Sequence, residues 1–151
     1  MRKLLLAAAL LAPLSALAEI KVVEPWIPEA PPNAQAMAAF MSIENDEDRP
    51  VKVVNAHAPG FKVIELHKSV EENGMHKMLK QEALVVPPMG SLELRPGSYH
   101  IMLIGVQDPR PKAGDVIPVR LDLEDGTQIT VQTPVKKRAD MMQRMQKMQG
   151  H

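Results

Sequence analysis

Short runs of alternating apolar and polar residues follow one another along the chain from position 19 onward. Such alternation is typical of strands with one buried face, because successive side chains along a strand point to opposite faces. Turn residues separate the runs, and fourteen prolines disfavour long helices. The pattern predicts strands at residues 20–23, 36–44, 51–57, 61–67, 75–79, 83–86, 91–94, 99–106, 116–123 and 127–135.

The connections between these runs complete the predicted fold. Residues 25–32 hold four prolines around Trp26 and are expected to form a long irregular connection. Residues 69–74 are polar and acidic and are expected to form a loop. Asp125-Gly126 lies between two alternating runs and is a strong hairpin signal. Many short strands without a convincing central helix predict an all-β fold, either an antiparallel β-sandwich or a Greek-key barrel.

The first eighteen residues have the pattern of a secretory signal peptide. Arg2 and Lys3 precede an apolar stretch over residues 4–14, and Ala-Leu-Ala at residues 16–18 suits cleavage before Glu19. The apolar stretch is too short for a stable membrane-spanning helix. We therefore expect an exported protein with no membrane anchor after cleavage; an uncleaved anchor is the alternative.

Composition narrows the chemistry that the chain can carry. The absence of cysteine excludes thiol redox centres, zinc-thiolate sites and a lipid-modified cysteine. Basic and acidic residues number 18 each, so nothing indicates nucleic-acid binding. No nucleophile–base arrangement indicates an enzyme. Eleven methionines stand out, since methionine is both a flexible core residue and a soft metal ligand.

Two histidines and two methionines form a candidate metal site. His100 and Met102 lie two residues apart in one predicted strand and therefore project from the same face. His67 ends another predicted strand, and Met78 lies just beyond the acidic loop. Thioether sulfur and neutral imidazole suit copper(I), whereas zinc seldom takes thioether, and calcium and magnesium prefer oxygen. Considered singly, each of these residues is more often structural than a ligand.

The spacing of these four residues resembles the signature of the periplasmic copper chaperones of the PCu(A)C type. His67, Met78, His100 and Met102 fit the pattern His-x10-Met-x21-His-x-Met. The resemblance extends over residues 22–135 and implies a cupredoxin-like β-sandwich that holds copper(I) with these four residues. It also implies a periplasmic carrier that delivers copper toward cytochrome c oxidase, with an oxidase subunit or a Sco-type assembly protein as its partner.

Two positions depart from the family pattern. The residue after the first ligand histidine is often acidic in such proteins, and here it is Lys68. A second methionine often lies two places before the ligand methionine, and here that place is His76. His76 is either an accessory ligand or an exposed loop histidine. His57 has no partner pattern and is expected to be structural.

The last sixteen residues, 136–151, form a tail that differs in composition from the 19–135 domain. Three of its methionines recur at helical spacing. The residues with metal-binding side chains in the tail are Met141, Met142, Met145, Met148 and His151. One hypothesis is a flexible tail, disordered or partly helical, because the segment is too short and polar for a stable isolated helix. The other is a second copper-binding segment.

Three functions remain compatible with the sequence. The first is a copper(I) metallochaperone. The second is a copper-sequestering or tolerance protein with the same site and no dedicated recipient. The third is a secreted β-sandwich interaction module that binds no metal and uses its methionines in the core. Metal binding separates the third from the others, and transfer to an acceptor separates the first two.

Overall fold

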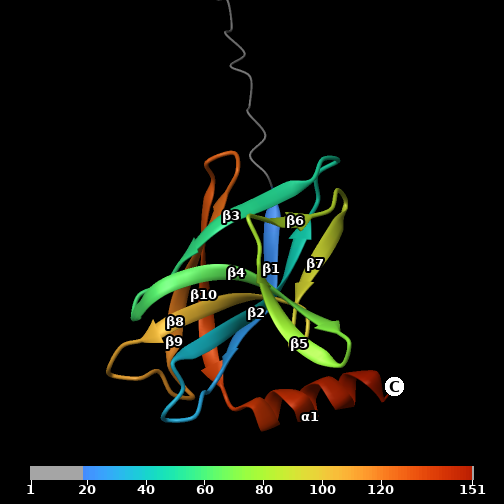
Figure 1. Cartoon of the computed structure of the whole chain (residues 1–151). Coiled ribbons are helices and arrows are strands. Elements are labelled where there is room, and N and C mark those ends of the chain that lie inside the picture. The colour runs from blue at the N-terminus through green and yellow to red at the C-terminus, as the bar shows by residue number, and fades with distance from the viewer. Residues whose placement is uncertain (1–18, 151) are drawn as a thin grey trace, which may run out of the picture.

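The computed structural model describes residues 19–150, which form ten strands and one helix (Figure 1). The predicted signal peptide (residues 1–18) and His151 lie outside the described residues. The elements are β1 (Ile20–Pro28), β2 (Ala36–Asn45), β3 (Val51–His57), β4 (Phe61–Glu72), β5 (Met75–Lys80), β6 (Leu84–Val86), β7 (Gly90–Leu94), β8 (Tyr99–Val106), β9 (Val116–Leu123), β10 (Gln128–Lys136) and α1 (Arg138–Gln149). Within residues 19–150, no helix combines the length and the apolar character needed to cross a membrane.

The strands form one continuous hydrogen-bonded order, β5-β4-β8-β7-β2-β1-β10-β9-β3-β6, with an additional pairing of β8 with β2. This order folds into the two layers of a β-sandwich (Figure 1). The layer from β5 to β1 is called the first sheet, and the layer from β10 to β6 is called the second sheet. β1 links them, because it also pairs with β10 in parallel at Ile27↔Val135. β7 and β8 form a second parallel pair. The all-β sandwich is therefore confirmed, although its pairing is mixed and not purely antiparallel.

The apolar side chains of the alternating pattern are buried between the inner faces of the two sheets. Leu66 on β4 and both Ile101 and Leu103 on β8 point into this core. Each buried aliphatic side chain of this size contributes about 1.5–3 kcal/mol, so a one-residue slip of either strand would be costly. The residues between them on β4 and β8 consequently face the outer side of the first sheet.

β1 extends further than the sequence analysis predicted. The expected irregular connection over residues 25–32 is wrong for its first half, because β1 continues through Pro28. The strand crosses a bulge between Val23 and Trp26. Proline lacks a backbone donor and is tolerated at bulges, which explains how Pro25 fits into a strand. The continuation pairs Trp26 with Phe40 of β2.

The predicted loop over residues 69–74 is also wrong. β4 continues to Glu72 and pairs antiparallel with β5 along its outer end. Asn73 and Gly74 make the turn, with φ of 54° and 74°. Asn-Gly is the preferred dipeptide for a two-residue turn with both φ angles positive. This turn signal outweighs the polar composition of the segment, and the resulting ribbon carries Met78.

α1 lies against the outer side of the first sheet, below β5 in Figure 1. Met141 is the one residue of α1 that the described structure buries, and it packs on Trp26 and Phe40. Lys137 precedes the helix without a side-chain cap. Met141 is therefore the main apolar anchor of the helix in the described structure. The division into leader, domain and tail stays a prediction.

Candidate metal centre

The register of β4 against β8 brings two of the predicted ligands together. His67 lies directly opposite His100, and Glu65 lies opposite Met102. Paired residues share a face of the sheet, as do residues two apart on one strand. All four side chains therefore project from the outer face of the first sheet. The rings of His67 and His100 are 5.6 Å apart between centroids.

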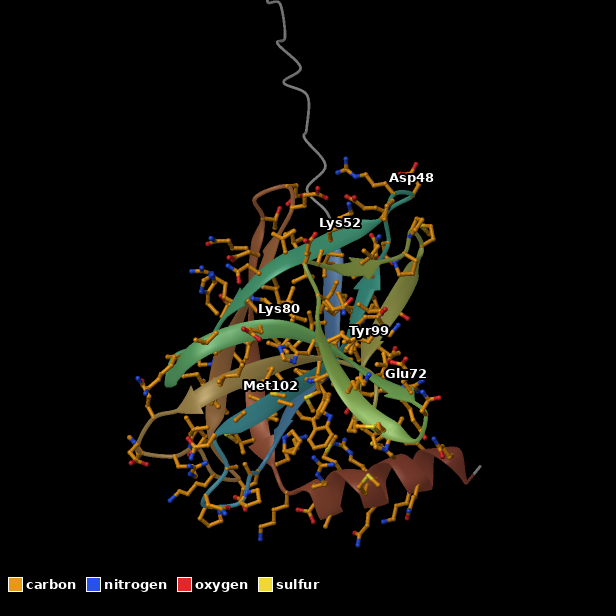
Figure 2. The ribbon with its side chains drawn as sticks, viewed as in Figure 1. Asp48, Lys52, Glu72, Lys80, Tyr99 and Met102 are labelled. Carbon is orange, nitrogen blue, oxygen red and sulfur yellow. The ribbon has the colours of Figure 1, made fainter. Side chains whose placement is uncertain are left out.

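A cavity of about 220 Å³ lies on this face. Its lining includes three of the four predicted ligands, Met78, His100 and Met102, which come from β5 and β8. β2 contributes Ala38 and Phe40 to the same cavity, and the first residue of α1, Arg138, lies at its edge. Figure 2 labels Met102 on β8, away from the end of the β4–β5 hairpin, where Glu72 is labelled. The ligand assignment itself stays a prediction that this geometry favours.

His100 is almost completely buried although it lies on the outer face, at 2% exposure. The Phe40 ring is 6.3 Å away, and Phe40 is in turn covered by Trp26 and Met141. Burial disfavours the charged imidazolium and lowers the pKa of His100 below its ordinary value, against a smaller opposing effect of its hydrogen bond to Ser98. The histidine is therefore held in the neutral form that a metal requires.

The hydrogen bonds of the two rings define which nitrogens are free. His100 Nδ1 lies 3.1 Å from the carbonyl oxygen of Ser98. His67 Nε2 lies 2.7 Å from Oε2 of Glu65. Carbonyl and carboxylate oxygens only accept, so both nitrogens donate, and in the neutral rings the other nitrogen of each ring keeps the lone pair. Those partners, His67 Nδ1 and His100 Nε2, are the buried side-chain nitrogen or oxygen atoms of residues 19–150 that lack a hydrogen-bond partner.

Glu65 is a site residue that the sequence analysis missed. Its carboxylate accepts from His67 and lies 3.6 Å from Lys80 Nζ. The hydrogen bond from His67 is the largest cause that lowers the pKa of Glu65. The signal was present, because Glu65 and His67 are two residues apart in a predicted strand and must share a face.

Met78 is the least enclosed of the predicted ligands. It is 58% exposed, and all of β5 is exposed. β5 is the first strand in the order of its sheet and therefore an edge strand. Met102, in contrast, is half-buried on the internal strand β8. The four proposed ligands thus combine three largely enclosed groups with one exposed thioether.

His76 and His57 are not among the residues that line this cavity. His76 is exposed on β5, two residues from Met78 and on the same face. His57 is exposed on β3, where it contacts Asp122 at 3.1 Å. Within the described part of the chain, no group of three or more His, Cys, Asp or Glu side chains is placed to hold a metal ion.

Comparison with known families assigns the chain to one of them. Residues 20–135 match the family described as putative lipoprotein LpqE-like. The chain belongs to the LpqE-like family. A putative lipoprotein of Leifsonia xyli is 34% identical to this LpqE-like chain over 118 residues, which cover 78% of the chain and 69% of the relative. An uncharacterized protein of Rickettsia prowazekii is 29% identical over 131 residues. The present LpqE-like chain has no cysteine.

Solved structures show the same fold. The copper-bound PCuAC domain of PmoF2 superimposes with a TM-score of 0.65 at 20% identity, covering 78% of the LpqE-like chain and 92% of the domain. The solution structure of copper(I)-bound DR1885 from Deinococcus radiodurans gives a TM-score of 0.62 at 29% identity, covering 87% and 84%. These relationships confirm the predicted resemblance to the PCuAC type and its cupredoxin-like β-sandwich.

Proposed function

We propose that the β-domain of this protein binds one copper(I) ion in the periplasm and carries it toward assembly of the copper centre of cytochrome c oxidase. The proposed ligands are His67, Met78, His100 and Met102. One observation carries the proposal: two buried imidazole nitrogens without hydrogen-bond partners lie on the same sheet face as the two thioethers, since Met78 pairs with Ser69, two residues from His67. A bound metal would satisfy both nitrogens, which otherwise remain desolvated and unpaired.

The chemistry of the four donors favours copper(I). All are neutral, and thioether sulfur is a soft ligand that copper(I) accepts and that zinc, calcium and magnesium seldom take. Methionine needs no deprotonation and forms no disulfide, so such a site suits an oxidising compartment. Four protein ligands leave no obvious open coordination position for a substrate, which favours carriage over catalysis.

Related proteins support the same function. A PCuAC domain of PmoF2 and the Deinococcus protein DR1885 have both been solved with copper, the latter as copper(I). The sequence pattern of an export signal supports the proposed location of the carrier in the periplasm. An oxidase subunit or a Sco-type assembly protein is the proposed partner, since the resemblance of the site to copper chaperones implies such a recipient.

Anaerobic copper(I) titration of residues 19–151 tests the site. The wild type should bind one copper(I) tightly in the domain, and a Met78→Ala/Met102→Ala double variant should lose that binding. Met75→Ala/Met89→Ala is a matched control, because both methionines are exposed and neither lines the cavity. X-ray absorption should show sulfur and nitrogen neighbours. A spectrum without sulfur scattering would contradict the assignment.

Transfer distinguishes the carrier from a sequestering protein with the same site. The copper-loaded protein should transfer its ion to an apo-oxidase copper fragment, whereas a sequestering protein should retain it against that acceptor. Absence of copper binding by the wild type would favour an interaction module instead. Each outcome is read from the copper content of the two separated proteins.

The tail is proposed as a second copper-binding segment. α1 leaves Met142, Met145 and Met148 exposed beside the domain, and clustered thioethers favour copper(I). The full mature protein should then take up more copper than a version that ends at Val135. Equal uptake and affinity in both would leave the tail without a role in metal binding.

A further inference from the structure

Glu65 and His67 form a hydrogen bond on the side of the His67 ring that is opposite the free nitrogen. Both side chains are largely enclosed, with 25% and 13% of their surfaces exposed. The 2.7 Å distance between Oε2 and Nε2 is that of a charge-assisted hydrogen bond. Because a carboxylate accepts only, this bond fixes the proton of the neutral His67 ring on Nε2. The lone pair is thereby fixed on Nδ1, which is buried and has no partner.

The two histidines are consequently locked in opposite tautomers. His100 donates from Nδ1 to the backbone of Ser98, which leaves Nε2 free. His67 donates from Nε2 to a side chain, which leaves Nδ1 free. The backbone partner of His100 survives any substitution, but the partner of His67 depends on residue 65. The carboxylate of Glu65 therefore controls the orientation of the His67 ring.

Lys80 holds the other oxygen of this carboxylate. Lys80 lies opposite His67 on β5, and its Nζ is 3.6 Å from Oε1 of Glu65. Lys80 is mostly exposed, so this contact is screened by solvent and contributes little by itself. Its effect is to occupy Oε1 while Oε2 faces the ring. The carboxylate also supplies one negative charge close to a site whose four donors are neutral.

We propose that Glu65 is a positioning residue for copper(I): it fixes His67 as the Nε2–H tautomer, aims Nδ1 at the ion and balances the charge of the ion. This proposal rests on the proposed function. Carboxylate partners of metal-bound histidines raise the basicity of the ligand nitrogen, and their loss typically lowers metal affinity 10–100-fold. We expect a loss of about this size for Glu65→Ala, and a smaller loss for Glu65→Gln, whose amide oxygen still accepts.

The first measurement needs no copper. Nitrogen–proton correlation NMR of the metal-free protein at about pH 8, where imidazole is neutral, should show His67 protonated on Nε2 and His100 protonated on Nδ1. His100 serves as the internal reference in the same spectrum. Glu65→Ala should give His67 a mixture of tautomers and leave His100 unchanged. Retention of a pure Nε2–H tautomer by Glu65→Ala would overturn the positioning role.

The second measurement is anaerobic copper(I) competition with the same variants. Glu72→Gln is the matched control, because Glu72 is also on β4 and also pairs with a lysine, at 3.3 Å from Lys77 Nζ, but lies at the exposed end of the hairpin (Figure 2). It should leave the copper affinity unchanged. Wild-type binding with an equal affinity in Glu65→Ala would overturn the role of Glu65 alone. Absence of binding by the wild type would overturn the proposed function and this role together.

Discussion

Replacing Met141 with alanine should release α1 from the outer face of the first sheet. Met141 is 6% exposed and is the one buried residue of the helix in the described structure. Full burial of a methionine side chain contributes about 1.5–3 kcal/mol, and contact with aromatic rings adds about 0.3–1.5 kcal/mol. A twelve-residue helix is marginal in water without such a contact.

These contributions set the expected change in population. If docking is worth about 2–3 kcal/mol, the docked form exceeds the undocked form by a factor of roughly 30–150. Alanine retains little of this contact, so the two forms should become comparable. The free energy of global unfolding should change much less, since the core between the two sheets does not include Met141.

Trp26 makes this change easy to follow, because it is the single tryptophan of the chain and packs on Met141. Met141→Ala should shift its emission to the red, increase its quenching by acrylamide and speed amide exchange throughout α1. Met148→Ala is the control, since Met148 is 74% exposed and should leave all three unchanged. Unchanged emission and exchange in Met141→Ala would refute the view that this residue holds the helix.

Three further predictions test other parts of the molecule. The ring of His100 in the metal-free protein should titrate below the ordinary imidazole pKa, because burial lowers its pKa. The free energy of unfolding should therefore fall as the pH drops below about 6.5, where the unfolded chain gains a proton first. Urea unfolding of His100→Gln should show less of this decrease. Gly105→Ala should destabilise the fold by about 1–3 kcal/mol in urea, because its φ is 73° and a Cβ would lie 2.8 Å from Lys62 Cβ; Gly60→Ala, also at positive φ but in open space, should cost less. Gly74→Ala should loosen the β4–β5 turn, seen as faster amide exchange in β5 with little change in core stability.

The positions of the ten strands could be predicted from alternation, because a strand with one buried face has an apolar residue at every second position. Their ends were harder to predict. β4 passes through polar residues at 69–72 because a two-stranded ribbon has no buried face to enforce alternation, and its length is set by the Asn73-Gly74 turn. β1 continues past Pro25 because a bulge accommodates the missing donor.

The candidate site was predictable in its ligand types but not in its surroundings. The spacing of His100 and Met102 places them on one face of any strand. That His67 lies opposite His100 depends on the register of β4 and β8, which is decided by core residues such as Leu66 and Ile101 on the opposite face of the sheet. Trp26, Phe40 and Met141 cover His100 through contacts between three segments that are distant in the sequence, and no local sequence pattern predicts these contacts.

The four proposed ligands differ in how firmly the fold holds them, and this difference bears on transfer. His67 and His100 are enclosed and fixed by hydrogen bonds, and Met102 lies on an internal strand. Met78 has a long flexible side chain on an exposed edge strand. Among the four proposed ligands, Met78 is therefore the one whose displacement by an acceptor would disturb the fold least, and three ligands would remain to hold the ion. Edge strands also offer unpaired backbone groups to an approaching chain, so β5 is the side on which an acceptor would reach Met78.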